Sequence, residues 1–517
     1  METVEIKNTE TTPIKKKGTV TTVLLLVLLF FGLLCFFSAS WYVKTYGDTG
    51  FDSIIYTLFS NMEGVQTGLV VQFLLGALLP AVICFLVIGF ILFWKYKKDL
   101  FVTIKDKKIK LLPLKKKMAK IICLVLALIL LIISATQVRL FGYIYSLTHQ
   151  STIFTDEYVD PDSVNLQFPE KKRNLIYIFL ESMETTFADT ENGGALPYNT
   201  TPELTKLAKQ YVNFSNTDKV GGFSTPTGTT WTIAAMTAHT AGIPLKAPGV
   251  FERNTYGKDL FLPGITNMTD ILHENGYYQA LMVGSDKSFA NRDVYYENHG
   301  VDKIYDLNTA REDKIVPEDY YVWWGMEDEY LFKYEKRELV KIAAQDQPFA
   351  FSLLTVDTHH VAGYICEECK ETYGEQYENV LSCASRHVNS FMNWLRRQKF
   401  YKNTTVVIVG DHLTMDSEYI SRNVSPEYDR RGYNCFINSA VTGENYKNRE
   451  FCAMDLFPTT LAAMGVEIPG NRLGLGTNLF SNKKTLIEEM GYDEFNTQIS
   501  RNSTHYIKNF LSVPEEE

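Results

Sequence analysis

Three long apolar stretches dominate the first quarter of the chain. Residues 18–43, 64–94 and 121–138 contain no charged side chain. Because a helix needs about 20 apolar residues to cross a bilayer, each stretch predicts a membrane-spanning helix. A cleaved signal peptide is the alternative for the first stretch, but its length and the spans that follow it argue against cleavage. The second stretch exceeds one bilayer thickness, so we expect it to tilt, with a kink at Pro80.

The pattern changes after residue 173, where short apolar runs alternate with amphipathic segments. Helical patterns cover residues 266–275 and 379–398, among others. Alternation of this kind predicts an α/β domain with a mostly parallel sheet, over residues 173–482. Four apolar runs predict its buried strands: residues 174–180, 278–284, 349–356 and 404–409.

The remaining segments are assigned from their composition. Residues 1–17 form a cytoplasmic tail ahead of the transmembrane region, which covers residues 18–138. Residues 51–59, between the first two spans, are a candidate interfacial helix. Residues 139–172 are predicted to be a juxtamembrane linker, first apolar and aromatic and then acidic. Residues 483–517, which end in three glutamates, are expected to form a peripheral C-terminal tail.

The lysines predict the orientation in the membrane. Lys15, Lys16 and Lys17 directly precede the first span, and eleven lysines lie between the second and third spans, where Asp99 and Asp106 are the only acidic residues. Lysine-rich segments stay in the cytoplasm, so three spans place everything after Arg139 outside the cell membrane. Lipid head groups or nucleic acid could also attract these lysines, but retention in the cytoplasm is a sufficient explanation. The net charge of -9 argues against nucleic acid as a partner of the whole chain.

Carboxylates and histidines follow three of the four predicted strands. The carboxyl ends of parallel strands meet at one edge of an open α/β sheet, which is where ligands bind. Carboxylate oxygens and imidazole nitrogens suit a divalent cation. Structural roles, such as a helix cap for an acidic residue or a loop position for a histidine, are the alternative. The residues are Glu181 after the first strand, Asp357, His359 and His360 after the third, and Asp411 and His412 after the fourth.

A candidate nucleophile, Thr232, is the last residue of a stretch rich in glycine and hydroxyl side chains, over residues 221–232. A helical pattern begins just after this loop, so Thr232 lies at a helix N-terminus. The exposed N–H groups and the helix dipole favour negative charge there, and a bound cation would further acidify the hydroxyl. The alternative is that Thr232 is simply the N-cap.

Several stretches together resemble one known family. The outer domain is similar to the lipoteichoic acid synthase and membrane phosphoglycerol transferase branch of the alkaline phosphatase and sulfatase superfamily, from about Asn174 to Asn482. The resemblance implies an alkaline phosphatase-like fold, preceded here by three spans. The motifs that carry it are LESME at 180–184, GTTWTIAAM at 228–236, LTVDTHH at 354–360, GDHL at 410–413, DLFPTTL at 455–461 and GNRLGLGTNLF at 470–480.

The resemblance also implies the site residues. It implies that Thr232 is the nucleophile and that the cofactor is a divalent metal ion, expected to be Mn²⁺, with Mg²⁺ or Zn²⁺ as alternatives. Two features depart from the family pattern: Ala290 replaces an aromatic residue common in the polymer-forming synthases, and Val361 replaces a proline usual in the glucan-modifying relatives. By resemblance, the metal ligands are Glu181, Thr232, Asp411 and His412, and the substrate-binding residues are Asn291, Arg292, His359 and His360.

The resulting hypothesis is a membrane-anchored phosphoglycerol transferase. It would move glycerol phosphate from phosphatidylglycerol to a cell-envelope glycan or glycerophosphate acceptor, through a phospho-threonine at Thr232. The same metal and threonine would also serve a phosphoethanolamine transferase, which is the main alternative. A sulfatase-type hydrolase usually needs a Cys or Ser in a short Pro and Arg motif, which the segment after Thr232 lacks. A sensor without catalysis would predict no metal and no turnover.

Five cysteines follow the last predicted span, on the side where disulfides can persist. Cys366 and Cys369 form a Cys-Glu-Glu-Cys stretch, which could be a zinc knuckle or a redox pair. No second such pair supports zinc. The interpretation favoured by the sequence is one or two structural disulfides, for example between Cys366 or Cys369 and Cys383.

Overall fold

The computed structural model describes residues 16–47, 50–59, 67–93, 101–104, 107–110, 116–246 and 260–512. The chain divides into two compact units. The first contains Met1–Asp48 and Gln66–Phe141, and the second contains Thr49–Val65 and Gly142–Glu517. The short segment before the second span therefore belongs to the same unit as the C-terminal three quarters of the chain.

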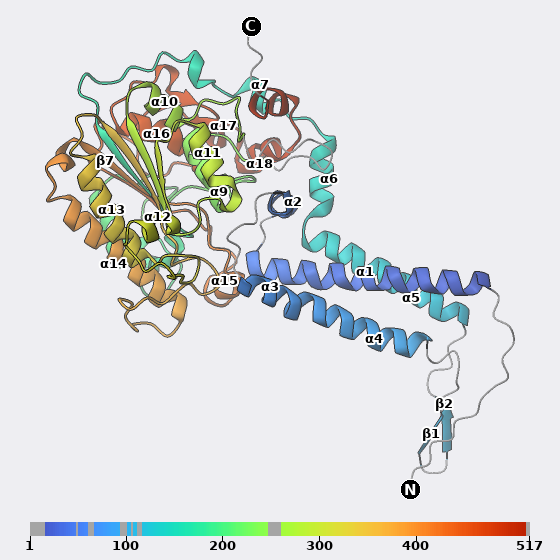
Figure 1. Ribbon diagram of the computed structural model, residues 1–517. Coiled ribbons are helices and arrows are strands. Elements are labelled where there is room, and N and C mark those ends of the chain that lie inside the picture. Colours follow the sequence, from blue (N-terminus) through green and yellow to red (C-terminus); the bar gives the residue numbers. More distant parts are fainter. Residues whose placement is uncertain are drawn as a thin grey trace. The chain divides into compact units, whose positions relative to one another are not determined.

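The first unit contains three helical spans, as the apolar stretches predict (Figure 1). Stretches long and apolar enough to cross a membrane cover Val20–Tyr46, Gly68–Leu92 and Lys117–Gln137. Large aliphatic side chains on these helices are exposed, as expected for surfaces that face lipid. The helices are α1 (Lys16–Tyr46), α3 (Thr67–Phe73), α4 (Leu79–Phe93) and α5 (Lys116–Gln137).

The second span is not a regular α-helix throughout. A π-helical segment, η1 (Leu74–Leu78), separates α3 from α4. Pro80 follows two residues later, and it has no N–H to donate to the carbonyl of Gly76. The disruption predicted at Pro80 thus takes the form of a wider helical turn just before the proline. The lysines that predict orientation lie mostly outside the residues whose side chains the structure describes, around the hairpin of β1 (Phe101–Ile104) and β2 (Lys107–Lys110).

The second unit is built on a six-stranded sheet with the order β5-β4-β6-β3-β7-β8. The four predicted strands are the four inner ones, and they run parallel. The sequence did not predict two short edge strands, of which β8 is antiparallel to β7. The strands are β3 (Asn174–Leu180), β4 (Tyr278–Val283), β5 (Lys303–Tyr305), β6 (Phe349–Leu354), β7 (Thr404–Gly410) and β8 (Asn434–Ile437).

Helices cover both faces of this sheet (Figure 1). Alternate residues of β3 show why: Tyr177 belongs to the core cluster on one face, whereas Ile176 and Ile178 belong to the cluster on the other. A strand buried on both faces is expected for a parallel sheet. One face packs against α9 (Thr232–Ala241), α10 (Met268–Glu274), α11 (Arg292–Asn298) and α16 (Leu456–Ala463), and the other against α8 (Pro202–Gln210), α13 (Asp328–Ile342) and α14 (Gln376–Leu395).

The segment predicted to be a linker packs against the domain at separate points, although many of its residues are exposed. Phe154 is buried, and Val159 exchanges backbone hydrogen bonds with Gly474 at 2.9 and 2.8 Å. Side chains that a linker would leave in water are therefore held against the domain. The remaining elements of this unit are α2 (Phe51–Phe59), α6 (Leu140–Thr148), α7 (Ile153–Asp156), α12 (Leu307–Glu312), α15 (Ser417–Asn423), β9 (Arg472–Leu473), β10 (Gly476–Thr477), α17 (Leu486–Met490) and α18 (Tyr492–Ser500).

The C-terminal segment is also part of the core, which corrects the expectation of a peripheral tail. Phe495 and Ile499 on α18 are each 1% exposed, as are Tyr506 and Phe510 further on. These side chains join the same core cluster as α9 and α16. Only the last residues, 513–517, lie outside the described part of the chain. The acidic C-terminal residues led to the prediction of a peripheral tail, but the preceding segment forms the amphipathic helix α18. The apolar side chains of α18 pack in the core of the domain.

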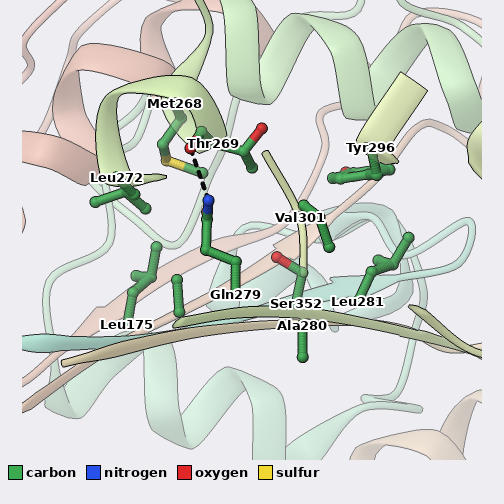
Figure 2. A pocket seen from close by; sticks show the side chains of 11 residues that line it. Leu175, Met268, Thr269, Leu272, Gln279, Ala280, Leu281, Tyr296, Val301 and Ser352 are labelled. Atoms are coloured by element: carbon green, nitrogen blue, oxygen red, sulfur yellow. Dashed lines mark hydrogen bonds between the residues drawn. The ribbon is translucent and has the colours of Figure 1, made fainter. Parts of the chain in front are cut away.

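A small internal cavity lies between α10 and the sheet (Figure 2). Gln279 is one of the polar residues that line it, and its amide nitrogen donates to the carbonyls of Thr269 at 2.7 Å and Gly300 at 3.0 Å. Leu175 and Ala350 line it from the amino ends of β3 and β6. The cavity therefore lies at the opposite end of these strands from Glu181, and its volume of about 10 Å³ is that of one water molecule.

Candidate active site at the carboxyl edge of the sheet

Two carboxylates and a histidine converge where β3 and β7 end. Leu180 pairs with Gly410 in the parallel register, so the residues that follow them emerge side by side. Glu181, Asp411 and His412 are 3%, 0% and 1% exposed, and their ligand atoms lie within 4.8 Å of one another. His412 Nε2 is 3.7 Å from Glu181 Oε1 and 3.4 Å from Asp411 Oδ2. The sequence prediction that these three residues meet is thus matched by the geometry.

Local hydrogen bonds orient each of these side chains. Asp411 Oδ1 accepts from the backbone N–H groups of Ser182 at 2.8 Å and His412 at 2.7 Å. The Ser182 hydroxyl donates to Glu181 Oε1 at 2.6 Å. His412 Nδ1 lies 2.9 Å from the carbonyl of Leu413, which places the proton on Nδ1. The lone pair of His412 Nε2 therefore faces the two carboxylates.

The turn after β7 is fixed by a close backbone approach and a buried ion pair. A Cβ on Gly410 would lie 1.8 Å from the carbonyl oxygen of Met183, so only glycine fits at this position. Glu184 accepts hydrogen bonds from Arg430 Nε at 2.9 Å and from the backbone N–H of Thr414 at 3.0 Å. These contacts hold the backbone that carries Asp411 in one conformation.

Thr232 is the first residue of α9, and its side chain does not cap the helix. Trp231 occupies the N-cap position without a side-chain cap. The Thr232 hydroxyl instead lies 3.3 Å from His412 Nε2 and 3.5 Å from Glu181 Oε2. Its side chain is partly exposed, so a substrate can reach it. The N-cap interpretation of Thr232 is therefore wrong, and the hydroxyl belongs to the carboxylate cluster.

The pKa shifts of Glu181, Asp411 and His412 indicate that the cluster favours a bound positive charge. Burial, and then the charge of Glu181, raises the pKa of Asp411 to about 7. Burial would raise the pKa of Glu181 as well, but His412 and His359 outweigh it and the pKa is lowered. Burial opposes charge on His412, yet Asp411 and Glu181 raise its pKa. Asp411 Oδ2 is buried without a hydrogen-bond partner among the described residues, so this donor set fits a divalent cation.

The two histidines after β6 lie beside this cluster. The His359 ring is stacked 4.4 Å from His360 and lies 4.5 Å from the ring of Trp324. His359 Nδ1 is 2.8 Å from the carbonyl of His360. Burial lowers the pKa of His359, while Glu181 acts in the opposite direction. A neutral His359 can therefore accept a proton or a hydrogen bond next to the carboxylates.

Asn291 and Arg292 lie at the start of α11, after β4. Both are buried, and Asn291 has a left-handed backbone with φ of 58°. The Arg292 guanidinium donates to Ser285 Oγ at 2.6 Å and to the Asp286 carbonyl at 2.7 Å. Burial lowers the pKa of Arg292 to about 10, although Glu181 acts to raise it. Arg292 is thus a fixed, charged guanidinium within electrostatic reach of the carboxylate cluster.

Residues that sequence reasoning missed hold the backbone of Glu181. Its N–H donates to the hydroxyl of Thr355 at 3.0 Å, and its carbonyl accepts from the hydroxyl of Thr358. Both threonines belong to the stretch that ends in His359 and His360. The two threonines could be seen beside the histidines in the sequence. The pairing of β3 with β6 was needed to show that they hydrogen-bond to the backbone of Glu181.

A second missed residue comes from the helix between the first two spans. The Tyr56 hydroxyl on α2 donates to the carbonyl of Ala290 at 3.1 Å, and its ring lies 5.6 Å from that of Trp231. Tyr56 therefore touches both the segment before Thr232 and the segment before Arg292. Nothing in the sequence signals this contact, because it joins residues far apart in the chain.

The parallel sheet, with an acidic cluster and a helix-end hydroxyl at its carboxyl edge, defines an alkaline phosphatase-like α/β domain. The chain belongs to the sulfatase family, whose profile matches residues 173–466. It is therefore a multi-pass membrane protein that carries a domain of this family.

Three known proteins illustrate the likeness. Phosphoglycerol transferase I of Xanthomonas campestris pv. campestris is 29% identical over 325 residues, which cover 60% of this chain and 43% of that protein. The lipoteichoic acid synthase LtaP of Listeria monocytogenes is 22% identical, with a TM-score of 0.45 over 62% of this chain and 79% of that one. The lipooligosaccharide phosphoethanolamine transferase A of Neisseria meningitidis is 14% identical, with a TM-score of 0.48 over 92% and 87%. The chain spans about two fifths of the length of the curated relatives it matches.

Proposed function

We propose that this chain transfers glycerol phosphate from phosphatidylglycerol to a glycan or glycerophosphate acceptor of the cell envelope. The observation that carries the proposal is the position of the Thr232 hydroxyl, at a helix N-terminus and 3.3 Å from His412 Nε2. The relatives named phosphoglycerol transferase I support the head group. The three spans support a lipid as the donor, because an anchored domain stays near the membrane surface.

Glu181, Thr232, Asp411 and His412 would hold a divalent cation, for which we propose Mn²⁺. When bound, the ion supplies positive charge that acidifies the threonine hydroxyl and neutralises charge on the phosphate. The residues themselves provide the rest of the site. Ser182 and Leu413 keep Asp411 and His412 turned toward the ion position, and the α9 N-terminus favours negative charge on the threonine oxygen.

The reaction is proposed to proceed by two displacements at phosphorus. Thr232 Oγ1 forms a bond to the phosphorus of phosphatidylglycerol, and the bond from phosphorus to the diacylglycerol oxygen breaks. The threonine proton passes to a neutral imidazole, His359 or His360, and the diacylglycerol oxygen takes up a proton. An acceptor hydroxyl then attacks the same phosphorus and gives its proton to the imidazole, which had passed the first proton to the diacylglycerol oxygen. The bond from phosphorus to Thr232 Oγ1 breaks, and the imidazole returns this proton to the threonine oxygen. Water can attack in place of the acceptor, so exclusion of water decides between transfer and hydrolysis.

The substrate side of the site is proposed to be the Asn291-Arg292 corner. Arg292 is charged, buried and held by Ser285, so it can contact a phosphate oxygen at a small cost in side-chain entropy. Asn291, in its left-handed conformation, follows Ala290, whose side chain is smaller than the aromatic residue common in the polymer-forming synthases. Catalysis outside the cytoplasm is part of the same proposal, because the lysine-rich segments are expected to stay inside.

The test uses the full chain in detergent with Mn²⁺ and phosphatidylglycerol labelled in its head-group glycerol. Mass spectrometry of the quenched protein should find a glycerophosphate adduct on Thr232. The Thr232→Ala variant should carry no label and show no transfer, although it folds. If Thr232 forms an adduct only with phosphatidylethanolamine, and that adduct is phosphoethanolamine, the chain is a phosphoethanolamine transferase and the proposed glycerol phosphate head group is wrong. Full transfer by Thr232→Ala would overturn the mechanism.

A further inference from the structure

A second cluster of metal-binding side chains lies outside the site described above. Cys366 and Cys369 belong to the loop that follows His360, and Cys383 and His387 lie on α14. Cys366 Sγ is 3.5 Å from Cys369 Sγ, 3.7 Å from Cys383 Sγ and 4.0 Å from His387 Nε2. The ligand atoms of Cys366, Cys383 and His387 lie within 4.8 Å of one another, and Cys369 adds a third sulfur atom beside Cys366.

The spacing of these residues explains why they meet. Cys366 and Cys369 form the two-residue interval common to zinc-binding loops. Cys383 and His387 are four residues apart on a helix, so their side chains lie on one face. Sulfur atoms about 2.3 Å from a tetrahedral zinc ion are about 3.8 Å apart, close to the observed separations. The second pair that the sequence seemed to lack is thus a Cys and a His on α14.

The surroundings resemble those of a closed structural site. Cys366, Cys383 and His387 are 3%, 2% and 8% exposed. The His387 ring is stacked on Phe332, 6.2 Å away, which limits its rotation. The carboxylate of Glu368 lies 3.8 Å from His387 Nε2 at the exposed side of the cluster. Three buried N and S donors, with the half-buried Cys369 as the fourth, match a structural zinc site, where no position is left for substrate.

The disulfide expected from the sequence is not formed. All eight cysteines, each of which lies in the described part of the chain, are free thiols. One disulfide would use two of the three clustered sulfur atoms and leave the third in contact with it. A free thiol beside a disulfide promotes exchange, so this arrangement has no stable single pairing. A metal ion satisfies all three sulfur atoms at once.

We infer that Cys366, Cys369, Cys383 and His387 bind a structural zinc ion. The ion would tie the loop after β6 to α14. Tyr364, two residues before Cys366, donates from its backbone N–H to the Asp357 carbonyl at 2.8 Å, so the loop is already closed on its own strand end. The clamp would therefore fix the backbone on both sides of His359. Zinc binding here requires no part of the proposed transferase chemistry.

The experiment measures zinc in the full chain purified in detergent without reducing agent. It uses the Asp411→Asn background, so that the carboxylate cluster does not contribute to the count. We expect about one zinc per chain, with zinc–sulfur distances of about 2.3 Å by X-ray absorption. Replacement of zinc by Co²⁺ should give thiolate charge-transfer absorption and the visible bands of a tetrahedral ion. The carboxylate cluster has no sulfur and cannot produce that charge-transfer band.

Variants show which residues hold the ion. Cys383→Ser should lose the zinc, whereas Cys435→Ala, which removes a buried thiol in β8, should keep it. His387→Cys supplies a fourth sulfur ligand and should keep zinc with a changed Co²⁺ spectrum, even if Cys383→Ser proves unstable. Zinc content unchanged by Cys383→Ser would overturn the inference. A disulfide among Cys366, Cys369 and Cys383 in non-reducing peptide maps, with no zinc, would overturn it as well.

Discussion

Tyr56 donates a hydrogen bond from its hydroxyl to the carbonyl oxygen of Ala290, at 3.1 Å and across 234 positions of the sequence. Its ring also lies against Trp231, the residue before the candidate nucleophile. One side chain of α2 thus contacts the two segments that carry Thr232 and Arg292. The helix is therefore placed to set the distance between the proposed nucleophile, Thr232, and the proposed substrate-binding residues Asn291 and Arg292.

Removal of the Tyr56 hydroxyl should loosen this corner. We expect Tyr56→Phe to lower kcat/KM for lipid donor by about fivefold to tenfold, because loss of one buried hydrogen bond costs roughly 1 kcal/mol. Mn²⁺ affinity should stay unchanged, since the Tyr56 hydroxyl donates to the Ala290 carbonyl and not to a proposed metal ligand. Steady-state kinetics with phosphatidylglycerol in mixed micelles checks the prediction, with the exposed Tyr321→Phe as control. An unchanged kcat/KM would show that the bond has no positioning role.

Asp411→Asn should separate metal binding from folding. The native pKa of Asp411 is raised to about 7, so the folded state favours its protonated form and loses stability as pH rises toward that value. An asparagine removes this charge and keeps the acceptor for Ser182 and His412. At pH of about 8 the metal-free variant should therefore melt higher than the metal-free parent, and Mn²⁺ should no longer raise its Tm.

Asp455→Asn is the matched control for that comparison. Asp455 is also buried, with a pKa raised to about 6, but it accepts from Cys452 and Thr477 rather than from residues of the site. This variant should retain the rise in Tm caused by Mn²⁺. A rise that persists in Asp411→Asn would remove Asp411 from the set of ligands.

Metal affinity should depend on pH in a defined direction. The ion and the proton compete for Asp411, whose pKa is about 7 in the metal-free protein. Protons also compete for His412, whose pKa is raised by Asp411 and Glu181, so each unit of decrease in pH below about 7 should weaken apparent Mn²⁺ binding by at least about tenfold. Isothermal titration in buffers of different ionisation enthalpy counts the protons released. Affinity that does not change from about pH 6 to about pH 7 would contradict the raised pKa.

Arg292→Lys should weaken donor binding more than it slows turnover. A lysine cannot reproduce the guanidinium that is held by Ser285 and the Asp286 carbonyl, so its charge is less well fixed. We expect KM for phosphatidylglycerol to rise by about tenfold, with kcat reduced less. Arg422→Lys, which changes an exposed arginine paired with Glu375, should leave both constants unchanged. A lower kcat with an unchanged KM would instead show that Arg292 acts in the chemical step and not in donor binding.

Truncation of Phe495 tests the packed C-terminal segment. Its side chain is 1% exposed in the core, so Phe495→Ala should lower the free energy of unfolding by about 3–5 kcal/mol. Tyr492→Ala, which changes a residue 39% exposed on the same helix, should cost less than about 1 kcal/mol. Denaturant unfolding followed by tryptophan fluorescence measures both. An equal loss in free energy of unfolding for the two variants would show that the segment is peripheral, as its sequence predicts.

The candidate site was predictable where chemistry follows a buried strand directly. Glu181 and Asp411 come immediately after β3 and β7, and the pairing of those strands brings them together. Local sequence carries this information, because the end of an apolar run shows where a buried parallel strand ends. The strand end in turn lies at the edge of the sheet. The short edge strand β8 contains four residues, too few to show a period, so it gave no such signal.

Long-range packing was the part that local sequence could not supply. Tyr56 and Trp324 reach the site from a helix and a loop whose positions depend on the whole fold. Phe495 was overlooked because the acidic ending dominated the composition of the tail. The spacing of Cys383 and His387 on a predicted helix suggests a pair of ligands. It had to be combined with the Cys366-Cys369 interval, a different pattern, before the four residues could be recognised as one site.

The two halves of the site have different origins in the fold. The distance between Glu181 and Asp411 is set by neighbouring strands, which lie about 4.8 Å apart in any sheet. The proposed substrate side, by contrast, consists of α2 and the segments around Trp231 and Arg292, which lie outside the strands. If the proposed function holds, substitutions there would exchange one lipid head group for another while the ion position stays the same. The sheet thus allows specificity to change over evolution without rebuilding the reaction centre.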